Sequence, residues 1–226
     1  MSNAPPDNRA AEVEPLVTCR VENRIAELMF NRPEGFNTLS EATLDCLTEQ
    51  FDQIRHDTEI AVVVIAARGK AFCTGHDMKE MYARRDQDFY ETLLDKCAAM
   101  MQRIPSLPQP VIAEVQGIAT AAGCQLVATC DLAIAAEDAS FATSGINNGL
   151  FCATPAVALG RSVPKKQALE MLFTGDFISA ERAAEIGLIN YCVPSSKLRA
   201  ETRALAEKIA SKSRYAIRLG KASYYR

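Results

Sequence analysis

Residues 115–126 read VQGIATAAGCQL, a strand-like segment that passes through glycine, alanine and threonine into a predicted helix. The helix is expected to begin around Ala122-Gly123. Small side chains let a ligand approach the backbone closely, and the first turn of a helix carries unpaired N–H groups and partial positive charge. This stretch therefore predicts a strand–turn–helix junction of an α/β protein that can bind a ligand oxygen.

A second junction of the same kind lies at residues 70–81, which read KAFCTGHDMKEM. Gly75 permits a tight backbone turn, and Asp77 can cap a helix that begins near Met78. If the N–H groups of the two junctions converge on one oxygen, they form an oxyanion hole.

Outward from these junctions, the chain repeats the pattern of a strand followed by a helix. The continuous apolar run at 61–67 is typical of a strand covered on both faces, as in a parallel sheet, and the pattern returns at 111–115 and 132–136. Two short runs at 16–20 and 24–30 predict a β-hairpin. Helices are predicted from Ser40 to about Arg55, from about Asp88 to Arg103, where Ile104-Pro105 ends the helix, at 155–161, 165–173 and 180–186, and from 196 onward.

Composition excludes several classes of protein. The chain has 226 residues and a formal net charge of −3, without the basic stripe of a nucleic-acid binder. No uninterrupted apolar run reaches the length of a membrane span. The eight cysteines form no C-x-x-C pair and there are only two histidines, so we expect no bound metal.

The N-terminal residues 1–15 carry one arginine and three acids, which is unlike a signal or transit peptide. We expect a disordered tail, or a tag remnant at Ser2-Asn3-Ala4. Dispersed cysteines without a secretory signal fit a reducing compartment, and we expect a cytoplasmic protein.

The two junctions resemble the paired oxyanion segments of the crotonase (enoyl-CoA hydratase/isomerase) family. The stretches Phe141–Leu159 and Ala168–Asn190 resemble that family too, so the likeness covers about residues 16–220. It implies an α/β fold, a crotonase-like spiral of ββα units with a helical C-terminal end. We expect a single domain at 16–226, with the spiral core at 16–194 and the start of a C-terminal helical region at 195–226.

The resemblance also implies a ligand. An acyl-CoA thioester would bind with its carbonyl oxygen between the backbone N–H groups of His76 and Ala122. Asp77, Met78 and Lys79 would line the pocket near coenzyme A. The coenzyme is then part of the substrate, no prosthetic group is expected, and the chain is expected to assemble as a homotrimer or a dimer of trimers.

Two positions depart from the family pattern. Hydratases of this family use two glutamates as acid and base, and the matching positions here hold Gln125 and Gly145. A carboxamide does not shuttle protons near pH 7, and glycine has no side chain. Because a general acid or base contributes about 10²–10⁴ to the rate, efficient hydration by that route is not expected.

Three functions therefore stay open. The first is an acyl-CoA lyase or isomerase of fatty-acid metabolism, the second a hydrolase or decarboxylase of acyl-CoA thioesters, and the third a non-catalytic acyl-CoA-binding or regulatory protein. Cys152 could attack a thioester as a thiolate, although a buried inert thiol is the favoured interpretation. A catalytic role for the His76 ring is weighed against simple packing, and one for Asp77 as a base against helix capping. The direction of the Glu114 side chain stays open.

Overall fold

The computed structural model describes residues 14–226. The predicted tail at 1–15 lies outside the described residues, apart from Glu14 and Pro15. The Asn31 side-chain amide donates to a carboxylate oxygen of Glu14 at 2.9 Å and to the Pro15 carbonyl at 3.1 Å.

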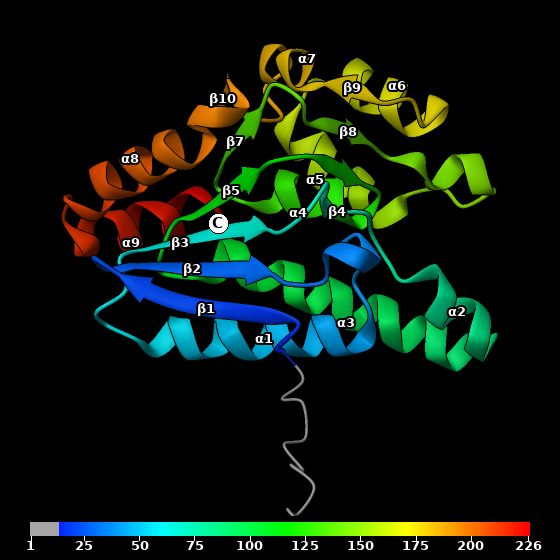
Figure 1. Ribbon diagram of the computed structural model, residues 1–226, viewed down its shortest axis with the longest axis horizontal. Coiled ribbons are helices and arrows are strands. Elements are labelled where there is room, and N and C mark those ends of the chain that lie inside the picture. The colour runs from blue at the N-terminus through cyan, green and yellow to red at the C-terminus, as the bar shows by residue number, and fades with distance from the viewer. Residues whose placement is uncertain (1–13) are drawn as a thin grey trace, which may run out of the picture.

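Two sheets form the framework of the described residues (Figure 1). The larger sheet has the strand order β1 (Val17–Glu22), β2 (Ile25–Phe30), β3 (Val62–Ala67), β5 (Val111–Val115), β7 (Leu132–Ala136) and β10 (Tyr191–Val193). The smaller sheet has the order β4 (Ala71–Cys73), β6 (Ile118–Thr120), β8 (Ser140–Ala142) and β9 (Ile178–Ser179). The predicted hairpin is confirmed, because β1 and β2 pair antiparallel, whereas β2, β3, β5, β7 and β10 pair in parallel.

The chain winds as a spiral between the two sheets. Each turn places one strand in the larger sheet and the next in the smaller sheet, as β3 and β4, β5 and β6, and β7 and β8 do, before helices follow. The ββα spiral implied by the resemblance is confirmed. The helices are α1 (Glu41–His56), α2 (Met78–Arg84), α3 (Gln87–Ser106), α4 (Ala122–Thr129), α5 (Ala153–Ser162), α6 (Lys165–Thr174), α7 (Ala180–Glu185), α8 (Leu198–Ala210) and α9 (Arg214–Tyr224).

Strand β3 explains why its sequence is apolar without interruption. Val63 and Ile65 belong to the main core with side chains of α1 and α3, whereas Val62 and Val64 pack in a second cluster with Ala206 of α8. Successive side chains of a strand point to opposite faces, so both faces of β3 are covered. The predicted parallel strand is therefore confirmed with its physical reason.

Two helix boundaries differ from the sequence prediction. Helix α3 continues through Pro105 to Ser106, and the Leu107 N–H donates to the Arg103 carbonyl at 2.9 Å. A proline in the last turn removes only one helical hydrogen bond, so the helix ends just after it. The helix expected from 196 onward is divided between Ala210 and Arg214, where Ser213 caps α9.

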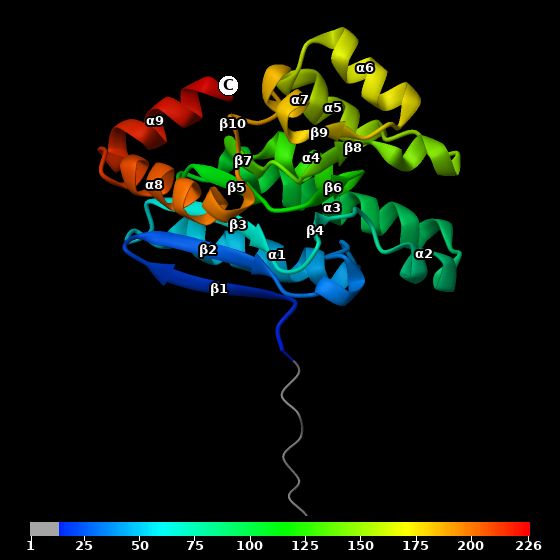
Figure 2. The ribbon, with the colours of Figure 1, turned by 45° about the horizontal axis from the view of Figure 1, so that its top comes forward.

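A buried ion pair fastens α9 to the core. The Lys221 Nζ lies 2.6 Å from a carboxylate oxygen of Asp131 and also donates to the Ile104 and Gln109 carbonyls at 2.9 Å. The Tyr225 hydroxyl donates to the other Asp131 oxygen at 2.9 Å. Figure 2 shows α8 and α9 together at one end of the molecule and α2 at the other.

Within residues 14–226, no helix combines the length and apolar character needed to cross a bilayer. The same residues hold no group of three or more histidine, cysteine, aspartate or glutamate side chains arranged to bind a metal ion.

Candidate active site

The two predicted junctions lie against each other, and two glycines make this possible. A Cβ added at Gly75, where φ is +87°, would lie 2.9 Å from the Ala121 Cβ and 3.2 Å from the Ala122 nitrogen. A Cβ at Gly123 would lie 2.0 Å from the Cys73 carbonyl oxygen. The first turn of α4 therefore packs directly on the backbone that follows β4.

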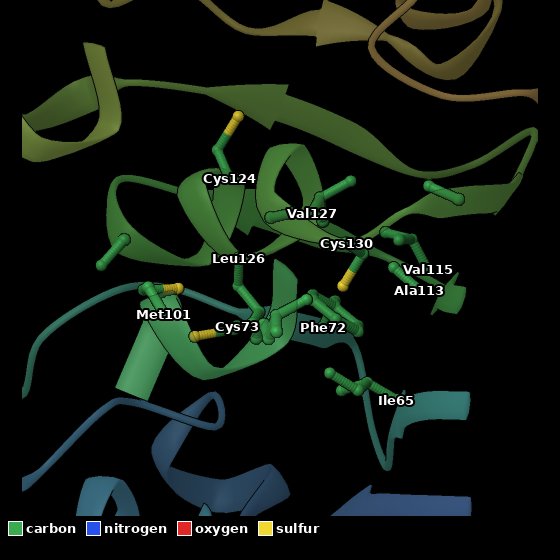
Figure 3. Close-up of a cluster of buried hydrophobic side chains, with 14 of the residues drawn as sticks. Ile65, Phe72, Cys73, Met101, Ala113, Val115, Cys124, Leu126, Val127 and Cys130 are labelled. Carbon is green, nitrogen blue, oxygen red and sulfur yellow. The ribbon is translucent and has the colours of Figure 1, made fainter. Parts of the chain in front are cut away.

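Buried side chains hold the two junctions in this arrangement. Figure 3 shows Leu126 pointing from α4 toward Phe72 and Cys73 of β4, while Cys124 points to the opposite side of the helix. All four side chains are fully buried. The backbone after β4 is also tied to the segment before α1, because the Leu39 N–H donates to the Gly75 carbonyl at 2.8 Å.

The predicted donors have no hydrogen-bond acceptor within the described residues. Neither the His76 N–H nor the Ala122 N–H donates to a backbone or side-chain group of residues 14–226. Ala121, which precedes the helix, has φ +51° and ψ −121°, and its own N–H donates to the Ala142 carbonyl at 3.0 Å. A non-glycine residue rarely adopts this backbone conformation, which costs about 1–3 kcal/mol.

The His76 ring is largely buried. Burial lowers the pKa of His76 below 6.5, so the imidazole is neutral at pH 7. Its Nε2 atom is buried, and no described residue reaches it with a hydrogen bond. A neutral ring can accept or donate one hydrogen bond there, but it provides no positive charge.

Asp77, Met78 and Lys79 form the start of α2. The Asp77 carboxylate accepts hydrogen bonds from the Lys79 N–H at 3.0 Å and the Glu80 N–H at 3.3 Å, and its second oxygen accepts from the Thr38 hydroxyl at 3.1 Å. Asp77 is therefore the helix cap that the sequence predicts. The Met78 and Lys79 side chains are exposed.

Gln125 lies one helical turn after Ala122 and is only 6% exposed. Its side-chain oxygen accepts a hydrogen bond from the Thr154 hydroxyl of α5 at 3.1 Å. Within the described residues no group accepts from its side-chain nitrogen. The carboxamide is thus anchored through its oxygen, with its nitrogen left as a donor.

Gly145 lies in a short 3₁₀ segment, η2 (Ser144–Asn148), beside Cys152. A Cβ at Gly145 would lie 2.6 Å from the Leu150 carbonyl oxygen and 2.8 Å from the Cys152 Sγ. A side chain at position 145 would therefore enter occupied space. Burial raises the pKa of Cys152, while a hydrogen bond from the Gly145 backbone opposes that shift, so the thiol is protonated at pH 7.

Glu114 does not belong to this arrangement. Its carboxylate pairs with Arg199 of α8 at 3.2 Å, and Arg199 also pairs with Glu27 of β2. Burial raises the pKa of Glu114, and the arginine opposes the shift.

A cavity of about 420 Å³ is also separate from the two junctions, because α9 and the end of α1 line it with residues such as Arg55, Gln109 and Arg218.

Sequence reasoning missed several polar residues that shape the site. Thr154 was not singled out, nor was Asn37, whose buried amide donates to the Arg68 and Ala71 carbonyls and whose oxygen accepts from the Arg32 N–H. Thr120 and Ser144 share a hydrogen bond of 2.7 Å between β6 and η2. Apart from Arg32, the partners of these residues are distant in sequence, so no local pattern could indicate them.

A profile described as "Enoyl-CoA hydratase/isomerase" matches residues 20–226. Enoyl-CoA hydratase domain-containing protein 3 of Mus musculus is 46% identical over 217 residues, which cover 96% of this chain and 72% of the relative. The crystal structure of an enoyl-CoA hydratase of Mycobacterium smegmatis matches with a TM-score of 0.92 and 53% identity, over 94% of this chain and 83% of that one. The structure of the human domain-containing protein 3 matches with a TM-score of 0.90 and 45% identity, over 93% and 83%.

The names of these relatives correct the expectation about the cellular compartment. The mouse, rat, Xenopus laevis and human relatives are all named mitochondrial, so the prediction of a cytoplasmic protein is wrong. Dispersed thiols indicate a reducing compartment without specifying which one.

The motifs G-H-D at 75–77 and A-A-G-C-Q at 121–125 indicate a likeness to the group named enoyl-CoA hydratase domain-containing protein 3. The same relatives confirm this likeness. With the profile spanning almost the whole chain and the ββα spiral in place, the chain belongs to the enoyl-CoA hydratase/isomerase family.

Proposed function

We propose that this chain is an acyl-CoA thioester enzyme of fatty-acid metabolism that stabilises an enolate in a backbone oxyanion hole. The donors are the N–H groups of His76 and Ala122. The observation that carries the proposal is the contact of the two junctions at Gly75 and Ala122, with both N–H groups left without an acceptor in the described residues.

The chemistry follows from where charge develops. Loss of a proton or of carbon dioxide from the α-carbon of a thioester moves negative charge onto the carbonyl oxygen. Two fixed N–H donors stabilise that oxygen more than the neutral carbonyl, and losing one such donor typically costs about 2.7–4 kcal/mol. The helix dipole of α4 adds partial positive charge at the same place.

Hydration by a pair of glutamates is not part of the proposal. Gln125 is a carboxamide held by Thr154, and the space beside Gly145 is filled by the Leu150 carbonyl and the Cys152 sulfur. Without either acid–base group, we expect the hydration of crotonyl-CoA to be at least about 10²-fold slower than with one of them in place.

Reactions that rely mainly on the oxyanion hole form a second candidate. Decarboxylation or hydrolysis of a thioester does not need both glutamates, and the missing pair favours such a reaction over hydration. Cys152 is not assigned as the nucleophile, because its buried thiol has a raised pKa.

The test combines binding with turnover. Isothermal titration of butyryl-CoA measures affinity, and loss of the enoyl absorbance of crotonyl-CoA measures hydration. We expect binding together with slow hydration, which Gln125→Glu increases. Absence of any affinity for CoA thioesters would contradict the proposal, and rapid hydration by the unaltered chain would contradict its account of Gln125 and Gly145.

We also propose that the chain assembles as a homotrimer or a dimer of trimers. Exposed apolar side chains gather around η2, α5 and α6, where Phe151 and Phe173 lie 6.3 Å apart between ring centroids. Apolar side chains exposed together in this way favour an interface between protein chains.

A further inference from the structure

We propose that the cavity between α9 and the end of α1 binds a phosphate monoester of a ring compound, which is the chemistry of a nucleoside monophosphate. The inference goes beyond the proposed function and does not rest on it, because the cavity shares no residue with the two junctions. It lies at the α9 end of the molecule, whereas α2, which begins next to His76, lies at the other end (Figure 2).

The attachment of α9 leaves room for a ligand beside its first half. Its second half is fastened through Lys221 to Asp131. Its first half, at 214–218, forms one wall of the cavity of about 420 Å³, and the turn between α1 and β3 forms the wall opposite together with Pro108 and Gln109. Pockets that bind small molecules measure about 300–1,000 Å³, so this cavity is large enough.

The wall opposite α9 is held in place by a buried carboxamide. Gln109 is 5% exposed, and its side-chain nitrogen donates to the Ile54 carbonyl at 2.8 Å and to the Asp57 carbonyl at 3.3 Å. The Ala61 N–H donates to the Arg24 carbonyl at 2.8 Å. Because this wall is fixed before a ligand arrives, binding loses less free energy in ordering it.

The charge of the cavity favours an anion. Arg55, Arg214 and Arg218 line it, and within residues 14–226 none of them forms an ion pair with a carboxylate. Asp57 is the only acid among the lining residues, and one of its carboxylate oxygens accepts from the Glu59 N–H at 2.7 Å. Three like charges around one cavity repel each other, and a bound anion relieves that repulsion.

A phosphate suits these cations better than a carboxylate does. The Arg55 guanidinium donates to the Ser106 hydroxyl at 2.6 Å, and the Arg218 guanidinium lies 5.6 Å from the centroid of the Tyr215 ring, so both groups are held in position. A planar guanidinium can donate two parallel hydrogen bonds to a phosphate. A phosphate monoester carries up to two charges on three terminal oxygens, whereas a carboxylate carries one charge on two.

The first turn of α9 adds to this preference. It contains no acidic residue, and it begins at Arg214, which lines the cavity. The N-terminus of a helix carries partial positive charge, which stabilises an anion nearby.

The remaining walls favour a ring attached to the phosphate. They are lined by the apolar side chains of Ile60, Ala61, Pro108 and Ile217. A ring placed against them removes apolar surface from water, and the exposed Tyr215 ring offers a face on which it can stack. The Thr58 hydroxyl and the Asp57 carboxylate, which also line the cavity, can accept hydrogen bonds from hydroxyl groups of a sugar.

The experiment measures Kd by isothermal titration for adenosine monophosphate, adenosine and inorganic phosphate. The unaltered protein is compared with Arg218→Gln, which removes one guanidinium from the cavity at an exposed position. Arg20→Gln is the matched control, because Arg20 is an exposed arginine of β1 outside the cavity. Lys79→Gln reports on binding near the proposed thioester site. Thermal unfolding of each variant checks that it folds.

We expect adenosine monophosphate to bind at least about tenfold more tightly than adenosine, which lacks the charge, or inorganic phosphate, which lacks the ring. Arg218→Gln should weaken the binding of adenosine monophosphate about tenfold or more, because a charged hydrogen-bond donor is lost. Arg20→Gln and Lys79→Gln should leave it unchanged.

Three results would overturn the inference. The first is a nucleotide that does not bind, or binds no more tightly than adenosine or inorganic phosphate. The second is an affinity that Arg218→Gln leaves unchanged. The third is a loss of affinity in Lys79→Gln, which would place the nucleotide at the thioester site. Binding of butyryl-CoA is measured separately, so failure of the proposed function is distinguishable from failure of this inference.

Discussion

At the scale of single residues, Gly75 and Gly123 bring the two predicted donors together, because neither leaves room for a side chain. The Gly123 position faces the Cys73 carbonyl oxygen at a distance that no Cβ can occupy. The small residues of 115–126 therefore serve close packing of backbone on backbone, as well as access for a ligand.

We predict that Gly123→Ala lowers the free energy of unfolding by about 1–3 kcal/mol or more, because the methyl group forces α4 away from β4. Gly160→Ala is the matched control in α5, where an added Cβ meets nothing within 4 Å. It should raise stability by about 0.5–1 kcal/mol through helix propensity. Urea denaturation measures both, and changes of the same sign would contradict the packing described.

Gly145→Glu should not simply restore the missing acid. Its side chain would collide with the Leu150 carbonyl and the Cys152 sulfur, so we expect a loss of about 1–3 kcal/mol in the free energy of unfolding. Cys152→Ala in the same chain should recover part of the loss by removing one of the two obstacles. Equal stability of Gly145→Glu and the unaltered protein would show that η2 moves freely.

His76 predicts a pH dependence of stability. Its pKa is lowered in the folded protein, so the unfolded state binds more protons as the pH falls below 6.5. The free energy of unfolding should therefore be fully retained above pH 6.5 and decrease below it. His76→Gln should reduce this slope and His56→Gln, at an exposed position, should keep it, as followed by urea denaturation between pH 7.5 and about 5.5.

The sequence identified the residues of the two junctions but not the contacts between them. Gly75, Asp77 and Ala122 lie in local patterns that predict turns, caps and helix starts. The bond between Thr154 and Gln125 joins residues 29 positions apart, and threonine is common at helix starts, so no local signal indicates it. The direction of Glu114 likewise depends on Arg199, which is 85 positions away.

At the scale of helices and strands, apolar runs predicted the parallel strands well because both faces of each are covered. The attachment of helix α9 was harder to predict from the sequence, because it depends on one buried lysine rather than on an apolar face. Lys221 and Asp131 have only 7% and 14% of their side chains exposed. Burial lowers the pKa of Lys221, and the Asp131 carboxylate opposes that shift.

We predict that Lys221→Met lowers the free energy of unfolding by about 3–5 kcal/mol, because Asp131 is left buried without its cation. Lys212→Met, at an exposed position between α8 and α9, should change it by less than about 0.5 kcal/mol. Urea denaturation gives both values, and amide hydrogen exchange in α9 should accelerate only in the first variant. Equal effects would contradict the role given to the ion pair.

At the scale of the whole molecule, the exposed apolar side chains around α5 and α6 predict self-association. Replacing Phe151 and Phe173 together with serine should reduce the mass measured by sedimentation equilibrium from that of an oligomer to that of one chain. Tyr82→Ser, at an exposed aromatic residue on α2, is the control and should leave the mass unchanged. An oligomer that survives the double substitution would place the interface elsewhere.

Infrared difference spectroscopy can show whether a thioester carbonyl binds between the N–H groups of His76 and Ala122. Butyryl-CoA carrying ¹³C at its carbonyl provides a band that can be followed in the complex without any turnover. Two aligned N–H donors draw electron density to the oxygen and weaken the C=O bond, so we predict that the band moves to lower wavenumber than in water. A band at or above its position in water would show that the carbonyl lacks these donors and would contradict the oxyanion hole.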